Sequence, residues 1–282
     1  LPVGDLRQAL AALAKKNGRD GESQSWIRDL LLYRFSKGSG LEGHNLGNLI
    51  LTALQDMTGS TALAVEIASK VFKLHGHIYP IITKNIQLVV EYQDGTVEIG
   101  ESILDDVTKH KRDRIVSLKT SPKATIYSKA KEAIEEADVI IIGPGDLYGS
   151  ILPNLVIDGV DQAFRVTKAN VVLTMNLMTR CTQTYGMTAK DHLWTVEKYL
   201  KRKVNIVIMN DEQIPGKLLK AYQKQDEFPI EDDLDDLDSY EIIRAALVRE
   251  TEVRRQKGDS LNRSYLRHDS VKLSKILKRI IN

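Results

Sequence analysis

The stretch from Ala137 to Asn154, ADVIIIGPGDLYGSILPN, constrains the fold of this chain more than any other segment. Val139 to Ile142 are four consecutive β-branched residues, which is typical of a strand covered on both faces in a parallel sheet. A Gly-Pro-Gly turn at 143–145 ends that strand abruptly, and polar residues follow it. Ligands of open α/β sheets bind just past the carboxyl ends of strands, so this turn predicts a phosphate or nucleotide site.

Composition excludes several classes of protein. The 282 residues suffice for one large α/β domain, and 42% hydrophobic with 28% charged residues is ordinary for a soluble globular protein. The net charge of +2 gives no global electrostatic reason to expect nucleic acid or a membrane surface as partner. A single cysteine, Cys181, excludes an intrachain disulfide framework and fits a reducing cytoplasm. No apolar run approaches the roughly 20 residues of a membrane helix, and no signal peptide is visible.

The first part of the chain shows helical periodicity. It predicts helices over residues 5–16, 25–35, 44–57 and 61–72. A doubly wound domain usually opens with a strand, so we expect a first strand to precede Leu1.

The pattern changes over residues 77–118, which we interpret as a small antiparallel β insertion. Short strands are expected at 78–82, 86–92, 97–99 and 115–118, with Asp94-Gly95 as a hairpin turn. The basic run at 109–114, KHKRDR, is predicted to be a solvated edge or turn, with a binding role as the alternative.

Strands and helices then alternate, which predicts βαβ units and a parallel sheet. Strands are expected at 139–142, 170–174, 204–209 and 261–266, and helices at 128–136, 159–167, 188–200, 216–222, 239–254 and 271–281. The acidic segment 225–238 is interpreted as a solvated loop, because its spacing does not match an EF-hand. We expect a single α/β domain over 1–282 that contains the insertion.

Polar residues gather at two helix starts near the amino terminus. Asp5 and Arg7 occupy a first helical turn, either as a cap with a surface cation or as a phosphate-binding pair. The glycine-punctuated segment GHNLGN at 43–48 supplies His44, Asn45 and Asn48, either for capping and packing or for contact with a ligand.

Further polar groups follow the predicted strands. Asn176 and Thr179 come after strand 170–174, so they are expected on the same rim as the 143–145 turn, and Asn210-Asp211 follow the next strand. Cys181 has no activating partner nearby in the sequence and is not expected to be a nucleophile. No G-x-S-x-G, H-E-x-x-H or Walker A motif occurs, and the 143–145 turn does not match G-x-G-x-x-G.

Five segments in this order resemble the YvcK-like gluconeogenesis-factor family, in the wider group that contains CofD, the 2-phospho-L-lactate transferase. They are GDLRQALAAL (4–13), LEGHNLGNLILTAL (41–54), ADVIIIGPGDLYGSILPNLV (137–156), NLMT (176–179) and RHD (267–269). The resemblance implies a Rossmann-like, mostly parallel sheet with flanking helices. It also implies a preceding strand with a glycine-rich turn and an Asp-Asp-Gly-Gly segment, which serves the acceptor and the metal in the transferase relatives.

The resemblance further implies a function. Resemblance to YvcK-like proteins implies binding of UDP-N-acetylglucosamine. It also implies a link to cell shape, wall synthesis and growth on gluconeogenic carbon. CofD moves a phospholactyl group from a guanosine-diphosphate carrier to a deazaflavin. CofD-type sequences tend to have Gly-Pro-Ser-Asn-Pro where this chain has Gly-Pro-Gly-Asp-Leu-Tyr, which favours a nucleotide-sugar-binding regulator. The alternatives are a metal-dependent transferase of a phosphorus-containing group and a scaffold that recruits a partner through its acidic or basic loop.

We therefore predict a cytoplasmic protein whose ligand is a UDP-sugar or a GDP-type nucleotide. Magnesium is the one metal ion considered as a companion of this ligand, and no other cofactor is predicted. No catalytic residue and no metal ligand is assigned. A second copy of the chain and a cell-wall regulatory protein remain open as partners. The predicted nucleotide- and phosphate-binding residues are Gly143, Pro144, Gly145, Asp146, Ser150, Asn154, Asn176, Thr179, Arg7 and Arg267. The predicted pocket-lining residues are Asp5, His44, Asn45, Asn48, Met178 and Tyr222.

Overall fold

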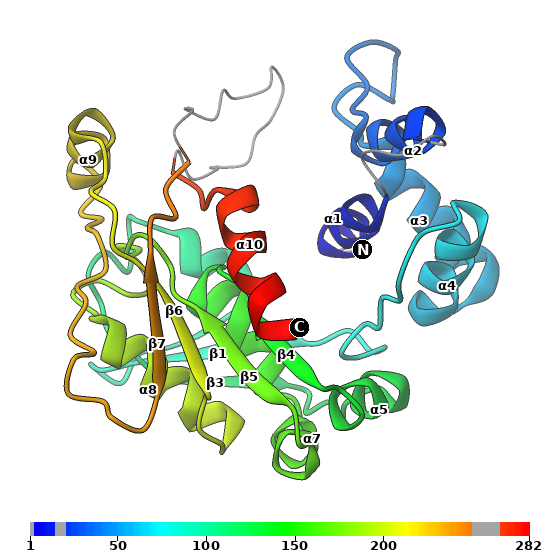
Figure 1. Cartoon of the computed structure of the whole chain (residues 1–282). Helices are drawn as coiled ribbons and strands as arrows, with labels where there is room; N and C mark the ends of the chain where they lie inside the picture. The colour runs from blue at the N-terminus through cyan, green and yellow to red at the C-terminus, as the bar shows by residue number, and fades with distance from the viewer. Residues whose placement is uncertain (1–2, 15–20, 250–265) are drawn as a thin grey trace. The chain divides into compact units, whose positions relative to one another are not determined.

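A computed structural model describes residues 3–14, 21–249 and 266–282 of the chain (Figure 1). Their contacts divide these residues into two compact units. The first unit contains residues up to 83, and the second begins at residue 84 and includes the carboxyl-terminal helix. Each unit is described by itself, and the expectation of a single domain stays a prediction.

The first unit consists of helices around a small leucine-rich core. The helices are α1 (Gly4–Leu13), α2 (Gly21–Leu32), α3 (Leu46–Thr58) and α4 (Thr61–Val71), close to the predicted ranges. Their core includes the fully buried side chains of Leu10, Leu31, Leu51 and Val65. The prediction of Asp5 as a helix cap is wrong, because Val3 occupies the cap position and Asp5 lies within the first turn of α1.

A glycine allows two parts of this unit to approach closely. Gly47 lies in the first turn of α3, and a Cβ atom built there would come within 2.5 Å of the Leu31 carbonyl oxygen and 2.8 Å of Arg7 Cγ. Arg7 is only 6% exposed. The helix-disfavouring glycine is therefore compensated by close packing against the stem of a buried arginine.

The second unit contains a small antiparallel sheet with the order β2-β1-β3. Its strands are β1 (Gln87–Tyr92), β2 (Val97–Ile99) and β3 (Ile115–Ser121), with the predicted Asp94-Gly95 turn between the first two. The 3₁₀ helix η1 (Glu101–Asp105) follows β2. The strand predicted over 78–82 is wrong: these residues form an irregular segment, and Pro80 has no N–H to donate to a ladder.

A four-stranded parallel sheet forms the centre of the second unit, which confirms the predicted Rossmann-like α/β fold. Its order is β4-β5-β6-β7. The strands are β4 (Val139–Ile142), β5 (Asn170–Thr174), β6 (Ile206–Asn210) and β7 (Glu241–Ala245). The helices are α5 (Ser128–Glu135), α6 (Leu152–Leu155), α7 (Val160–Val166), α8 (Ala189–Leu200), α9 (Gly216–Gln223) and α10 (Ser270–Ile281), with a π-helical turn, η2 (Leu147–Ile151), before α6.

Two predictions about these strands are wrong. Residues 241–245 form β7 rather than part of a helix, because β6 offers a parallel edge and pairs with them from Ile206↔Glu241 to Asn210↔Ala245. β4 is not covered on both faces: it is an edge strand of the described sheet, and Ile141 is 38% exposed. The end of the helix predicted over 239–254 and nearly all of the strand predicted over 261–266 lie outside the described residues.

Helices cover both faces of the parallel sheet, as Figure 1 shows. On one face, the apolar side of α10 packs through Leu273, Ile276 and Ile280 against a cluster that includes Val172 and Ile208. On the other side lie α5, α7 and α8. Because the four strands run parallel, the loops that follow them lie together at the carboxyl-terminal end of the sheet.

The packing at Gly47 gives a stability prediction. We expect Gly47→Ala to reduce the free energy of unfolding by about 1–2 kcal/mol, because overpacking against a backbone oxygen outweighs the helix preference of alanine. Urea unfolding measures the change. Gly143→Ala is the control, since a Cβ there would meet no protein atom within 4 Å. An unchanged or raised stability for Gly47→Ala would contradict the close approach.

Candidate functional site

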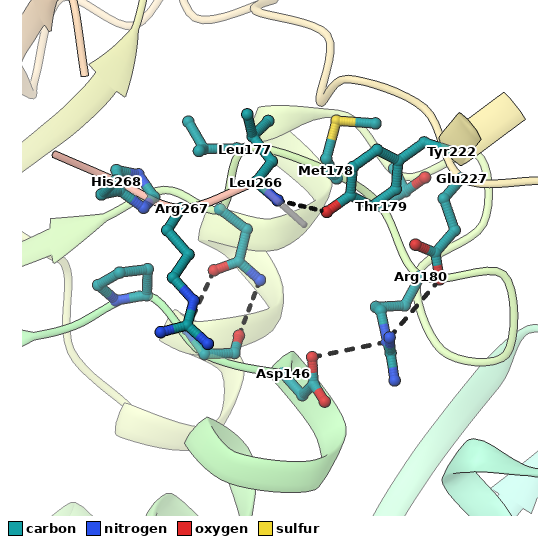
Figure 2. Close-up of a pocket in the computed structure, with 13 residues that line it drawn as sticks. Asp146, Leu177, Met178, Thr179, Arg180, Tyr222, Glu227, Leu266, Arg267 and His268 are labelled. Carbon is teal, nitrogen blue, oxygen red and sulfur yellow. Dashed lines mark hydrogen bonds and ion pairs between the residues drawn. The ribbon is translucent and has the colours of Figure 1, made fainter. Parts of the chain in front are cut away.

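A pocket of about 400 Å³ lies at the carboxyl-terminal side of the parallel sheet (Figure 2). Its walls are formed by the loops after β4 and β5, by Tyr222 of α9 and Glu227 just after it, and by the residues just before α10. The predicted site residues that line it are Pro144, Gly145, Asp146, Asn176, Met178, Thr179, Tyr222 and Arg267. Sequence reasoning missed five others, namely Leu177, Arg180, Glu227, Leu266 and His268.

Two reciprocal hydrogen bonds join the loops after β4 and β5. The Gly145 N–H donates to Asn176 Oδ1 at 3.1 Å, and Asn176 Nδ2 donates to the Gly145 carbonyl at 2.7 Å. The amide that we expected to face a diphosphate is therefore bonded within the protein. A Cβ at Gly145 would meet its nearest atom, Ser150 Cβ, at an ordinary 3.5 Å, so close packing within the protein does not exclude a side chain there.

The remaining predicted residues of this segment lie outside the pocket lining. The Ser150 N–H donates to the Asp146 carbonyl at 2.7 Å, and Asn154 Nδ2 donates to the Ser150 carbonyl at 2.7 Å. These bonds stabilise the π-helical turn that follows the glycines. Gly143 directly precedes the first lining residue. The roles of Gly143, Ser150 and Asn154 toward a ligand stay predictions.

Arg267 is brought to the pocket by a short antiparallel pairing. The Arg249 N–H donates to the Arg267 carbonyl at 3.0 Å, and the Leu266 N–H donates to the hydroxyl of buried Tyr222 at 2.9 Å. Asp269 caps α10 by accepting from the amides of Val271 and Lys272 in its first turn. Arg267 lines the pocket, and its guanidinium forms no ion pair or hydrogen bond within the described residues. Its planar fork of N–H donors suits an anion.

A second arginine lies among three carboxylates. Arg180 donates to Asp105 at 2.8 Å and forms longer ion pairs with Asp146 at 3.6 Å and Glu227 at 3.7 Å. Burial raises the pKa values of Asp146 and Glu227, and the opposing attraction of Arg180 does not cancel this effect. These partners are dozens of residues apart in the chain, so no local motif could reveal them.

The basic run at 109–114 forms the predicted exposed turn, and it also contacts residues next to the pocket. Lys111 and Arg112 both bind the Asp226 carboxylate at 2.6 Å, and the Arg112 N–H donates to the Cys181 carbonyl at 2.7 Å. Both contacted residues are sequence neighbours of pocket residues. The insertion is therefore linked to the pocket through these contacts.

The acidic segment 225–238 is likewise more than a solvated loop. Thr179 and Phe228 exchange two hydrogen bonds, of 2.7 and 2.9 Å, and Asp232 binds Arg244 of β7 through two bonds of 2.6 and 3.0 Å. Opposite charges on neighbouring elements therefore order a segment whose composition alone indicated solvent.

Other predicted residues have structural roles or belong to the first unit. Asn45 is buried and caps α3 by accepting from the Asn48 N–H at 3.0 Å, while His44 is exposed. Asp5, Arg7, His44, Asn45 and Asn48 all lie in the first unit, so their place beside a ligand stays a prediction. Asn210 accepts from the Leu247 N–H at 3.0 Å. Cys181 is buried, and burial raises the pKa of its thiol, as expected of an unreactive cysteine.

Two further properties bear on function. Within the ranges that the structure describes, no three His, Cys, Asp or Glu side chains are placed to hold a metal, and in the pocket a guanidinium lies among the carboxylates. No helix in those ranges is both long and apolar enough to cross a membrane.

The parallel sheet and the pocket at its carboxyl edge define a Rossmann-like α/β protein with a candidate ligand site. The chain belongs to the family described as 2-phospho-L-lactate transferase CofD, whose model matches residues 1–248. The family resemblance predicted from the motifs is thus confirmed.

Relatives support a finer placement in that family. A putative gluconeogenesis factor of Thermotoga maritima is 33% identical over 279 residues, 99% of this chain and 83% of that protein. A gluconeogenesis factor of Bacillus subtilis is 33% identical over 279 residues, 98% of this chain and 81% of that protein. The crystal structure of a UPF0052-family protein from Bacillus halodurans aligns with a TM-score of 0.83 at 31% identity, covering 100% of this chain and 83% of that chain.

The buried carboxylates give a pH prediction. The pKa of Glu227 is raised by burial, so its ionised form costs stability at neutral pH, and that cost disappears as the pH falls through its folded-state pKa. We expect Glu227→Gln to be at least as stable as the parent chain at pH 7. The difference should shrink when the pH is lowered from 7 to 4.5, as the parent carboxyl takes up a proton. Urea unfolding at both pH values measures it, and a less stable variant at pH 7 would show that the Arg180 ion pair dominates.

Proposed function

We propose that the pocket binds a nucleotide sugar, with UDP-N-acetylglucosamine as the leading ligand, and that the chain acts as a regulator without turnover. The observation that carries this proposal is Arg267, held at the pocket with its guanidinium available for a diphosphate beside the loop that follows β4. The pocket volume of about 400 Å³ lies within the range of small-molecule sites.

The lining supports a division of roles. Arg267 binds the phosphates of the ligand. Asn176 joins the loop after β5 to the loop after β4 through its two hydrogen bonds with Gly145. Tyr222 supplies an apolar wall while its hydroxyl holds Leu266. Thr179 lines the same rim, although its hydroxyl already accepts from Phe228.

The relatives support a cellular role for such a site. They are named gluconeogenesis factors, which fits a regulator needed for growth on gluconeogenic carbon. In this proposal the chain is located in the cytoplasm and takes part in cell shape and wall synthesis. Its partner is a second copy of the chain or a cell-wall regulatory protein.

The family description favours a second candidate, a transferase acting on a nucleoside-diphosphate-linked donor such as a GDP derivative. Such chemistry uses carboxylates to hold magnesium at the diphosphate. In the described pocket, Asp146 and Glu227 instead face Arg180, which favours binding without transfer.

Calorimetric titration separates the two candidates. The chain is titrated with UDP-N-acetylglucosamine, UDP and GDP, each with and without magnesium, and the mixtures are analysed for products. Binding of the UDP-sugar without metal or product supports the regulator. Preference for GDP with strict dependence on magnesium would replace it with the transferase.

Removing the available cation should weaken nucleotide binding. We expect Arg267→Ala to lower affinity for UDP-N-acetylglucosamine about 10- to 100-fold, since a hydrogen bond to a charged group contributes about 1.5–3 kcal/mol. Arg279→Ala is the matched control, because Arg279 lies by a cavity at the amino ends of β5, β6 and β7. Equal affinities for both variants, measured by calorimetry, would remove Arg267 from the site.

A side chain at Gly145 should fill space that the ligand needs. We expect Gly145→Val to lower affinity at least about 10-fold by steric exclusion while the melting temperature stays near that of the parent. Gly216→Ala, at the start of α9 and outside the lining, serves as a control for a glycine substitution in open space. Unchanged binding by Gly145→Val would show that the ligand does not approach this loop.

A further inference from the structure

The pocket has two ends of different chemistry, as Figure 2 shows. Arg267 lies at one end, and Asp146, Arg180 and Glu227 lie at the other. We propose that Asp146, Arg180 and Glu227 form a subsite that hydrogen-bonds the hydroxyl groups of the sugar carried by the diphosphate. This inference rests on the proposed nucleotide-sugar function, and it identifies the three side chains that would recognise the sugar.

The spacing of the three side chains leaves hydrogen-bonding capacity unused. Arg180 Nε lies 3.6 Å from Asp146 Oδ1, and Nη1 lies 3.7 Å from Glu227 Oε1, both beyond hydrogen-bond length. Arg180 Nε is buried and has no hydrogen-bond acceptor in the described part of the chain. The guanidinium is therefore attracted to both carboxylates without being saturated by them.

A sugar hydroxyl fits this arrangement better than other groups. A hydroxyl both donates and accepts, so it can accept from an Arg180 N–H while it donates to a carboxylate oxygen. The pocket presents an acceptor, a donor and an acceptor in the order Asp146, Arg180, Glu227. Vicinal hydroxyls of a sugar ring offer the complementary series.

Charge orients the ligand. Glu227 is only 5% exposed, and with Asp146 it gives this end of the pocket two carboxylates for one guanidinium. A diphosphate placed there would be repelled, whereas the available Arg267 attracts it at the other end. The neutral sugar is thus directed toward the acidic end and the phosphates toward Arg267.

Contacts other than the Glu227 carboxyl also hold the wall at the acidic end. Asp226, clamped by Lys111 and Arg112, and the paired Thr179 and Phe228 already fix the backbone around Glu227. Burial raises the pKa of the Glu227 carboxyl, although Arg180 and a hydrogen bond from the Cys181 backbone act in the opposite direction, so its ionised form is held at a cost. A ligand that uses this carboxyl explains its position.

Comparing UDP with UDP-N-acetylglucosamine tests the subsite. We expect Glu227→Gln to lower the affinity for the UDP-sugar about 10-fold or more and to leave the affinity for UDP within about twofold, because only the sugar reaches this carboxyl. Arg267→Ala should lower both affinities. Glu241→Gln, the same substitution at the amino end of β7, is the matched control and should change neither. Calorimetry measures all of them, and thermal unfolding confirms that each variant is folded.

The outcomes separate this inference from the function on which it rests. If the parent chain binds neither UDP nor the UDP-sugar, the proposed function fails and the subsite fails with it. If the parent chain binds both, and Glu227→Gln changes both affinities equally or neither, the subsite is overturned while the nucleotide-sugar function stands. A loss confined to the UDP-sugar supports the subsite.

Discussion

The parallel ladder from β4 to β7 is the constraint on which the rest of the second unit depends. It brings four carboxyl ends to one edge, where the backbone groups beyond the ladder need new partners. Side chains from neighbouring loops supply them: Asn176 bonds both backbone groups of Gly145, and Asn210 accepts from the Leu247 N–H. Tyr222 then accepts from the Leu266 N–H. The pocket is the space enclosed by loops that satisfy one another in this way.

The small antiparallel sheet supports the same site from outside it. Lys111 and Arg112, which precede β3, bind Asp226, and Asp105 at the end of η1 binds Arg180. The insertion therefore supplies cations to a carboxylate of the large-sheet loops and a carboxylate to an arginine of those loops. These contacts reach the acidic end of the pocket, where Arg180 and Glu227 lie.

The sequence predicted those features whose cause is local. The β-branched runs of β4 and β5 and the Asp94-Gly95 turn specify their structures within a few residues. Pro144 and Gly145 of the glycine turn line the pocket, and their role toward a ligand stays a prediction. β7 was mistaken for a helix because its strand state depends on pairing with β6. Arg180 and Glu227 were missed because each acquires its role from distant partners, and because an acidic stretch has the composition of a solvated loop. The composition of a segment indicates its average exposure, and it does not identify a single buried side chain such as Glu227.

The two ends of the pocket place different energetic demands on the fold. The Arg267 backbone is held by pairing with Arg249, and within the described residues its guanidinium forms no ion pair. Asp146 and Glu227 are different, because burial raises their pKa values even beside Arg180, so their ionised forms are held against a desolvation cost. Local inconsistencies of this kind concentrate at functional sites, where a ligand supplies the missing partners. In the proposed sugar subsite, a hydroxyl group would donate to these carboxylates and accept from Arg180 Nε, which has no hydrogen-bond acceptor among the described residues.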